Sequence, residues 1–248
     1  MSELASDTLS ETLPTATFIV MKQIILLRHG QSRWNLENRF TGWTDVDLTD
    51  AGREEARKAG QAMLRAGLQP RYMFTSVLRR AIHTLQIAAA EMELDWVPVL
   101  KDWHLNERFY GALQGLDKSA TAEKYGAEQV HLWRRSFDEQ PPLLTPDDPR
   151  FPGHDSRYAA LTDDELPLTE SLRDTIARVR SCWEENIVPR LHDVDCVLIA
   201  AHGNSLRGLA MLLLHMTASE VTSLEIPTGK PWVLTTDDRL AVQTAAYL

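Results

Sequence analysis

The sequence is poor in cysteine, in long apolar runs and in positive charge. Only two cysteines, Cys182 and Cys196, occur in 248 residues; this argues against a secreted disulfide scaffold, and both are expected to be small core residues. No run of about 18 apolar residues occurs, so no membrane span is expected. Lys and Arg total 26 against 35 Asp and Glu, a net charge of -9. General nucleic-acid or membrane-surface binders need a broad basic face, so neither class is expected, although a local basic pocket remains compatible with this charge.

The first residues also lack the features of a targeting segment. Residues 1–17 are rich in Ser and Thr and contain Asp and Glu but no Lys or Arg. A secretory signal needs a basic start and an apolar centre, and a mitochondrial signal needs arginine. We therefore expect a disordered leader at residues 1–20, a single catalytic domain at residues 21–248, and a cytoplasmic protein.

What is present is an alternation of short apolar stretches, typical of buried strands, with longer amphipathic stretches, typical of helices. Strands are predicted at residues 23–28, 70–76, 96–100 and 196–203, and helices at 48–67, 77–92, 119–137, 171–191 and 204–216. Residues 141–170 are crowded with Pro, Asp and Gly, which indicates a long loop or lid. The alternation predicts an α/β fold, a three-layer α/β/α sandwich with a mostly parallel central sheet.

Two of the predicted strands end in histidine followed by glycine. The first strand runs into RHG (residues 28–30), and the last runs into HGN (residues 202–204). Ligands bind at the carboxyl ends of the strands in such sheets. We therefore expect His29 and His202 to face one another across a pocket beside Arg28, with each glycine allowing a sharp turn and a close approach of a ligand.

The residue types around these histidines suit a phosphoryl group. Arginine forks pair with phosphate oxygens two at a time, and a helix N-terminus near Asn204 would add N–H donors. Thr75-Ser76 would add hydroxyl groups, and the candidate arginines are Arg28, Arg80, Arg134 and Arg135. A neutral histidine is nucleophilic at pH 7, and cations offset the charge on the transferring oxygens. Arginine clusters are also common on solvated helix faces, so the composition leaves that alternative open.

Phosphoryl transfer also needs an acid/base group for the substrate hydroxyl. Glu107, in the stretch "LNERFYG" at residues 105–111, is a candidate, although the pattern does not distinguish it from an ordinary surface glutamate. Two histidines and a carboxylate could instead bind zinc. No HExxH or CxxC spacing occurs, and the neighbouring arginines would repel a cation, so no metal site is expected.

Longer stretches resemble the cofactor-dependent phosphoglycerate mutases of the histidine phosphatase superfamily. "LLRHGQSRWNLENRFTGWTDVDLT" is similar to their signature, and further matches follow in order: "TSVLRRAIHTL", "LNERFYGALQGLDKSATAEKYG", "VHLWRRSF", "LPLTESLRDT", "AHGNSLRGL" and "EIPTGKP". The RHG tripeptide alone indicates only the superfamily. The ERxYG, LQG and RR motifs together with "LPLTESL" indicate the mutase branch.

The resemblance implies a role for each matching residue. His29 would be the nucleophile, Glu107 the proton donor and acceptor, and His202 the group that stabilises the transferring phosphoryl group. Arg28 and Arg80 would complete the catalytic set. The implied substrate-binding residues are Arg28, Ser32, Asn35, Thr41, Gly42, Arg80, Glu107, Tyr110, Lys118, Arg134, Arg135, Gly203 and Asn204. Among them, Tyr110, Lys118, Arg134 and Arg135 would hold the substrate carboxylate and its distant phosphate.

The implied activity is an isomerase reaction of glycolysis and gluconeogenesis. Phosphohistidine at His29 would donate to 3-phosphoglycerate, and the resulting 2,3-bisphosphoglycerate would reorient and return its other phosphoryl group, leaving 2-phosphoglycerate. The bisphosphate would thus be both primer and intermediate, and no metal would be needed. The resemblance also implies a small phosphorylated substrate as partner and a homodimer.

Two alternatives remain open. A phosphatase of the same superfamily would use water as the acceptor. The presence of Lys118 and the pair Arg134-Arg135 argues against it, whereas the ending "AAYL" lacks the Lys- and Gly-rich tail of many mutases, which leads us to expect more hydrolysis. A non-catalytic protein that binds phosphorylated ligands is the second alternative. The presence of both His29 and Glu107 argues against that one.

Overall fold

The computed structural model describes residues 21–248, so the leader expected at residues 1–20 lies outside the described residues. Within them, one sheet has the strand order β3-β2-β4-β1-β5-β6. The strands are β1 (Lys22–Arg28), β2 (Tyr72–Thr75), β3 (Val99–Lys101), β4 (Cys196–Ala201), β5 (Pro231–Thr236) and β6 (Val242–Tyr247). The first four in the sheet order pair in parallel, whereas β5 is antiparallel to both β1 and β6.

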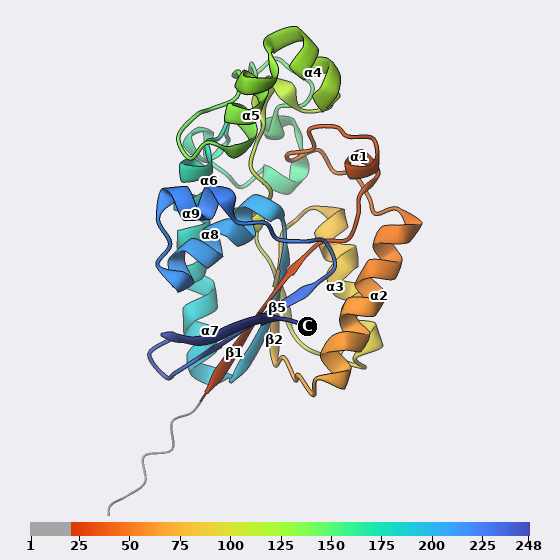
Figure 1. The fold of residues 1–248 in the computed structure, drawn as a ribbon, viewed down its shortest axis with the longest axis vertical. Coiled ribbons are helices and arrows are strands. Elements are labelled where there is room, and N and C mark those ends of the chain that lie inside the picture. Colours follow the sequence, from red (N-terminus) through yellow and green to blue (C-terminus); the bar gives the residue numbers. More distant parts are fainter. Residues whose placement is uncertain (1–20) are drawn as a thin grey trace, which may run out of the picture.

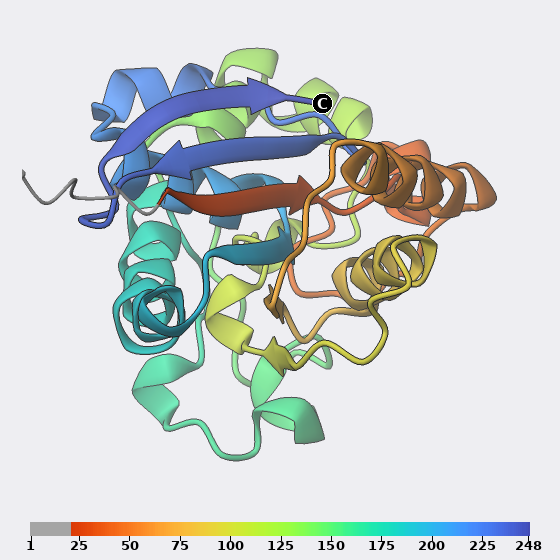
Figure 2. The same ribbon diagram turned by 90° about the horizontal axis from the view of Figure 1, so that it is seen from below.

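Helices cover both faces of this sheet. They are α1 (Arg33–Leu36), α2 (Asp50–Arg65), α3 (Arg79–Glu91), α4 (Lys118–Tyr125), α5 (Ala127–Arg135), α6 (Leu172–Cys182), α7 (Val188–Asp193), α8 (Gly203–Leu214) and α9 (Ala218–Ser223). Helices α2 and α3 lie on one side of the sheet, and α6, α7 and α8 lie on the other (Figures 1 and 2).

Alternation along the buried strands supplies two cores. In β1, Ile24 and Leu26 pack in the cluster that includes α6 and α8, whereas Ile25 and Leu27 pack in the cluster that includes α2 and α3. Successive side chains of a strand point to opposite faces, so a strand that is apolar throughout must be covered on both. The predicted three-layer α/β/α sandwich with a mostly parallel sheet is therefore confirmed.

Both cysteines lie in these cores, as predicted. Cys182 and Cys196 are buried and unpaired. Burial raises the pKa of Cys196 to about 12 and also raises the pKa of Cys182. Because the thiolate is the reactive form, neither side chain is suited to nucleophilic chemistry.

The long segment between β3 and α6 forms a cap over the carboxyl edge of the sheet, with α4 and α5 at its top (Figure 1). The loop predicted at residues 141–170 is present and contains only short 3₁₀ turns, at Pro152–His154, Ser156–Tyr158 and Asp163–Glu165. This cap closes over the strand ends where the two histidines were expected.

Several element boundaries differ from the prediction. The helix expected at 119–137 is two helices, because Gly126 has φ of +88° and cannot continue an α-helix. The helix expected at 171–191 contains a π-helical turn, Trp183–Ile187, just before Pro189, whose nitrogen has no hydrogen to donate. The antiparallel pair β5 and β6 was not predicted.

Candidate active site

The parallel pairing of β1 with β4 places the two histidines together. Arg28 is in register with Ala201, and the His29 N–H donates to the Ala201 carbonyl at 3.0 Å. The next residue on each strand is therefore a histidine, and the ring centroids of His29 and His202 are 5.0 Å apart in an edge-to-face arrangement. Both rings are buried. The two strand ends thus bring the histidine rings into contact, and His29 lines the cleft beside them.

The His29 ring is set up as a nucleophile. Its Nδ1 lies 2.7 Å from the Gly30 carbonyl oxygen. A carbonyl can only accept, so Nδ1 holds the proton and Nε2 keeps its lone pair. Burial, with Arg80 and Arg28 acting in the same direction, lowers the pKa of His29 well below its usual value of 6.5. The ring is therefore neutral at pH 7, the form that attacks phosphorus.

Two positions of the site require glycine, each for a different structural reason. A Cβ at Gly30 would lie 2.1 Å from the Gly52 carbonyl oxygen, so this glycine allows the first turn of α2 to pack against the strand end. Gly42 has φ of +54°, a left-handed conformation that favours glycine. Its carbonyl accepts a hydrogen bond from Arg80 Nη2 at 2.7 Å. Both glycines therefore shape the backbone around the pocket.

Arg80 is held rigidly at the start of α3. It is 1% exposed, and besides its bond to Gly42 it donates from Nη1 to the Thr44 carbonyl at 2.9 Å. Burial lowers the pKa of Arg80 to about 10, although the Glu107 carboxylate acts in the opposite direction. The guanidinium therefore remains charged at neutral pH.

Arg28 and His202 each present a buried atom without a protein partner. Arg28 Nη1 donates to the Ile226 carbonyl at 2.8 Å, but its Nε has no acceptor among residues 21–248. His202 Nε2 lies 2.7 Å from Ser76 Oγ, but its Nδ1 has no hydrogen-bond partner in the described part of the chain. A buried polar atom left unpaired costs free energy. An anion in the cleft that Arg28 lines would give its guanidinium a further partner, so Arg28 fits a phosphoryl group.

Glu107 stands across the pocket as a carboxylate base. Its Oε1 accepts hydrogen bonds from Asn204 Nδ2 at 2.7 Å, from the Asn204 N–H at 3.2 Å and from the Arg108 N–H at 2.8 Å. Burial alone would raise the pKa of Glu107, but the Arg108 N–H, Arg80 and Asn204 outweigh it, so the pKa lies below its usual value. The side chain is therefore ionised at pH 7 and ready to accept a proton.

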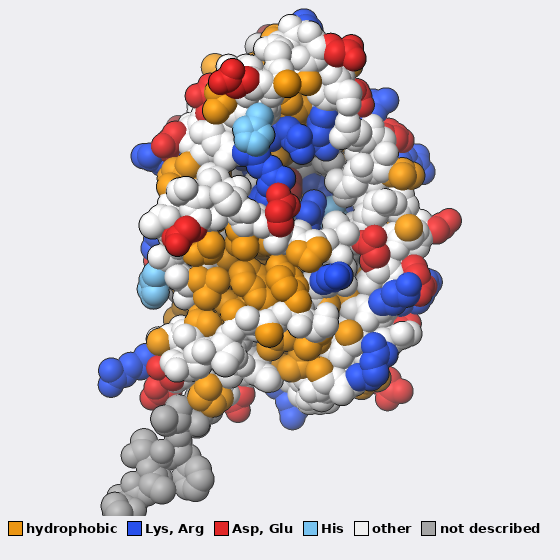
Figure 3. Space-filling model, in the orientation of Figure 1, with side chains coloured by type: hydrophobic (Ala, Val, Ile, Leu, Met, Phe, Trp, Pro, Cys, Tyr) orange, Lys and Arg blue, Asp and Glu red, His pale blue; other side chains and the backbone are white. Residues whose placement is uncertain are grey.

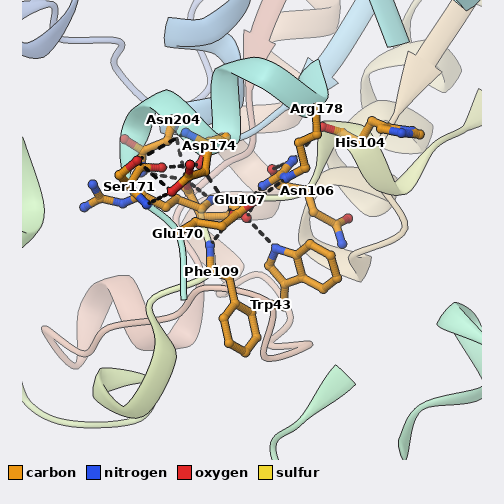
Figure 4. Close-up of polar contacts among 12 residues, drawn as sticks. Trp43, His104, Asn106, Glu107, Phe109, Glu170, Ser171, Asp174, Arg178 and Asn204 are labelled. Carbon is orange, nitrogen blue, oxygen red and sulfur yellow. Dashed lines mark hydrogen bonds and ion pairs between the residues drawn. The ribbon is translucent and has the colours of Figure 1, made fainter. Parts of the chain in front are cut away.

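The main chain of Glu107 is held from the other side (Figure 4). Its carbonyl accepts hydrogen bonds from Trp43 Nε1 at 2.6 Å and from Arg178 Nη2 at 2.9 Å. Arg178 Nη1 also donates to the carbonyls of His104 at 2.6 Å and Asn106 at 3.0 Å. One guanidinium therefore binds three carbonyls of the loop that bears Glu107. Sequence reasoning missed Arg178 and Trp43, since neither has a local pattern that marks such a role.

A buried carboxylate completes this arrangement. Glu170 Oε1 pairs with Arg178 Nε at 2.7 Å, and Glu170 Oε2 accepts the Phe109 N–H at 2.7 Å (Figure 4). The Glu170 N–H in turn donates to the Phe109 carbonyl at 2.9 Å. The Glu170–Arg178 pair thus holds the loop on both sides of Glu107. Glu170 belongs to the quoted "LPLTESL" stretch, but its role depends on a contact that the sequence alone does not show.

The pocket extends from the histidines towards α4 and α5. Figure 3 shows Lys and Arg side chains gathered in a hollow on this face of the molecule. The lining residues are Arg28, His29, Asn35, Arg39, Phe40, Thr41, Gly42, Arg80, Glu107, Tyr110, Lys118, Arg134, Arg135, Gly203, Asn204, Arg207 and Glu225. Almost all the residues named from the sequence are therefore brought together around one cleft.

Four of the named residues do not line it, and all four are buried: Ser32, Thr75, Ser76 and His202. His202 is fully buried beside His29, and Ser32 is fully buried as the N-cap of α1. Ser32 Oγ accepts the Asn35 N–H at 3.2 Å, so this hydroxyl shapes the turn that presents Asn35. The position of Ser32 does not test the substrate contact expected from the sequence, so that contact stays a prediction.

Four lining residues were missed by sequence reasoning: Arg39, Phe40, Arg207 and Glu225. A signal existed for Arg207, because it follows Asn204 by three positions in α8 and such residues share a helix face. Its Nη1 donates to Asn204 Oδ1 at 3.2 Å. The other three lie in loops, where spacing does not reveal which side chains point into a cleft.

In residues 21–248, no group of three His, Cys, Asp or Glu side chains is arranged to hold a metal ion. Among the helices of that same range, none is long and apolar enough to cross a membrane.

Comparison with known proteins gives the same picture. The model of the histidine phosphatase superfamily (branch 1) matches residues 24–245. A structure named mycobacterial hydrolase 1 is similar at 22% identity, over 92% of this chain and 97% of that chain, with a TM-score of 0.69. A mycobacterial glucosyl-3-phosphoglycerate phosphatase is 21% identical over 92% and 97%, with a TM-score of 0.66. Bacillus stearothermophilus YhfR is 22% identical over 87% and 92%, with a TM-score of 0.65.

At these identities the solved structures support the fold, whereas the family match extends over almost the whole chain. The family is one of enzymes, phosphatases and phosphoryl-transferring mutases among them. The strand-end histidines, the arginines beside them and the family match agree: the chain belongs to branch 1 of the histidine phosphatase superfamily.

Proposed function

We propose that the protein interconverts 3-phosphoglycerate and 2-phosphoglycerate, with 2,3-bisphosphoglycerate as primer and intermediate. The observation that supports this most is a second group of cations in the same cleft as the phosphoryl site. Lys118, Arg134 and Arg135 line the cleft from α4 and α5, and Arg39 lines it from the turn after α1. A phosphatase that accepts many substrates needs to hold only the phosphoryl group. A mutase must also hold a carboxylate and a second phosphoryl group.

The first transfer uses the neutral and charged groups described above. The phosphoryl group leaves His29 Nε2 as the substrate hydroxyl oxygen forms the new P–O bond, and the hydroxyl proton passes to the Glu107 carboxylate. Arg28, Arg80 and His202 offset the charge on the three transferring oxygens. No metal has a role, because fixed guanidinium groups supply the positive charge.

The second transfer reverses these roles. The bound bisphosphate reorients, its other phosphoryl group forms a bond to His29 Nε2, and Glu107 returns its proton to the oxygen that leaves. Free 2,3-bisphosphoglycerate supplies the phosphoryl group that first loads His29. The distal cations Lys118, Arg134 and Arg135 hold whichever anionic group is not reacting.

A phosphatase is the second candidate. One of the solved structures with a similar fold is a glucosyl-3-phosphoglycerate phosphatase. On the same residues, water in place of the sugar-acid hydroxyl would release inorganic phosphate from His29. The two candidates therefore share the transfer to His29 and differ in the acceptor and in the need for the distal cations.

The test is a phosphorus NMR time course on 3-phosphoglycerate with excess EDTA, with and without a trace of 2,3-bisphosphoglycerate. We expect 2-phosphoglycerate to appear and reach an equilibrium mixture, faster with the trace. Steady release of inorganic phosphate in place of 2-phosphoglycerate would contradict the mutase and favour the phosphatase. No reaction in either tube would contradict both.

A further inference from the structure

The cleft contains two carboxylates, and the proposed reaction uses only one. Glu107 accepts and returns the proton, whereas Glu225 has no part in the transfer. The Glu225 side chain is 67% exposed, and its Oε1 lies 2.6 Å from Arg135 Nη2. Its Oε2 lies 3.9 Å from Arg207 Nη2. One carboxylate therefore bridges two of the cations that line the cleft.

The main chain on both sides of Glu225 is held by arginines of the same cleft. Arg207 Nε donates to the Leu224 carbonyl at 2.8 Å, and Arg28 Nη1 donates to the Ile226 carbonyl at 2.8 Å. These bonds fix the Cα of Glu225 at the rim of the cleft. Its carboxylate consequently cannot move far from Arg135 without leaving the cleft for water.

We propose that Glu225 is an internal competitor for the distal anionic group of the substrate. In the free enzyme its carboxylate pairs with Arg135 and Arg207 in the way that a ligand carboxylate or phosphate would. A substrate that uses these cations must displace it, so Glu225 weakens binding and speeds release. The inference rests on the proposed function, because only a ligand with two anionic groups reaches beyond the phosphoryl site.

The expected size of the effect on substrate affinity follows from the solvent exposure of the Glu225 side chain. A solvent-exposed ion pair contributes at most a small free energy, since both partners are well hydrated when separated. Glu225 can therefore move into water at little cost, and we expect it to lower affinity by about two- to fivefold rather than to block the site. A competition between charges also weakens as salt is added.

The experiment compares Glu225→Gln and Glu225→Ala with the wild type by calorimetric titration at low salt. The control is Glu128→Gln, an exposed glutamate in the first turn of α5 that does not line the cleft and that changes the net charge equally. Each protein is titrated with 3-phosphoglycerate and, separately, with inorganic phosphate. We expect both Glu225 variants to bind 3-phosphoglycerate about two- to fivefold more tightly, with phosphate affinity and Glu128→Gln unchanged.

Two results would overturn the inference. Unchanged affinity for 3-phosphoglycerate in both Glu225 variants would mean that the carboxylate does not compete. An equal gain for inorganic phosphate would mean that the effect is a general change of potential rather than a local exchange. The proposed function is judged separately, by the phosphorus NMR time course on the wild type, so the failure of one is distinguishable from the failure of the other.

Discussion

The two nitrogens of the His29 ring have different partners, and this decides which one reacts. Nδ1 is bonded to the Gly30 carbonyl, so the free Nε2 is the atom that would bind phosphorus. His29→Ala should abolish the acid-labile phosphoprotein formed from labelled 2,3-bisphosphoglycerate, as measured by quenching in alkaline denaturant and filtration at high pH, where phosphohistidine is stable. Exposed His192, on α7, supplies the control His192→Ala, which should label normally. Persistent acid-labile label in His29→Ala would refute the assignment of the nucleophile.

The Glu107 carboxylate is already surrounded by three N–H donors, so an amide of the same shape can occupy its place. Glu107→Gln should keep the fold but slow turnover by about 10²- to 10⁴-fold, because no group remains to take the hydroxyl proton. Steady-state rates measure the loss of turnover, and far-ultraviolet circular dichroism shows whether the fold is kept. Turnover close to that of the wild type would exclude Glu107 from proton transfer.

The loop between β3 and α4 and the helix α6 act as one unit through the Glu170–Arg178 pair. Removing one partner leaves the other charge buried and unpaired, which costs about 3–5 kcal/mol, whereas replacing both costs less. We therefore expect Arg178→Met and Glu170→Gln to destabilise the protein strongly as single changes, and the double variant to be more stable than their sum predicts. Urea unfolding of the four proteins measures this coupling.

The Glu170–Arg178 pair also positions Glu107, and a measurement of stability alone does not detect this role. Arg178→Lys keeps the charge but cannot reach three carbonyls and Glu170 at once. We expect kcat to fall while KM for 3-phosphoglycerate changes little, since the substrate-binding cations are elsewhere in the cleft. A variant that is destabilised but has an unchanged kcat at low temperature would show that Arg178 supports the fold and does not position the acid/base.

The folded protein buries the neutral rings of His29 and His202, and this makes its free energy of unfolding depend on pH. Burial, followed by Arg80, lowers the pKa of both His29 and His202 well below 6.5. The unfolded chain binds these protons near pH 6.5 and the folded chain does not, so the free energy of unfolding is highest above 6.5 and falls as pH drops. Between pH 7.5 and 5.5 each ring should contribute a fall of about 1.4 kcal/mol.

Urea unfolding at the two pH values tests this expectation. His29→Asn should reduce the fall by about 1.4 kcal/mol, whereas the exposed control His192→Asn should leave it unchanged. The same pH dependence in His29→Asn and in the wild type would mean that the buried ring is not the source. Carboxyl groups titrate mostly below this pH range, so they contribute little to the change in the free energy of unfolding between the two pH values.

Much of the fold could be predicted because its signals are local. The apolar run of β1 and the helix predicted at 48–67 depend on neighbouring residues, and the structure begins that helix, α2, after Thr49, whose hydroxyl accepts the Gly52 N–H. The strand β6 could not be predicted in the same way, because it is an exposed edge strand with a weak apolar pattern. The largely buried strand β5 was missed although it begins with the apolar run Trp232–Leu234. Gly126 shows the limit within a helix, since one left-handed residue divides a continuous amphipathic stretch in two.

The α/β class, the strand ends that bear His29 and His202, and the resemblance that singled out Glu107 can all be recognised in the sequence. These depend on short motifs and on alternation along the chain. The folded structure was needed to show that Arg178 and Glu170 hold the Glu107 loop and that Glu225 bridges Arg135 and Arg207. Such contacts join segments far apart in the chain, and the register of the sheet and the packing of the cap, not the local pattern, bring them within hydrogen-bonding distance.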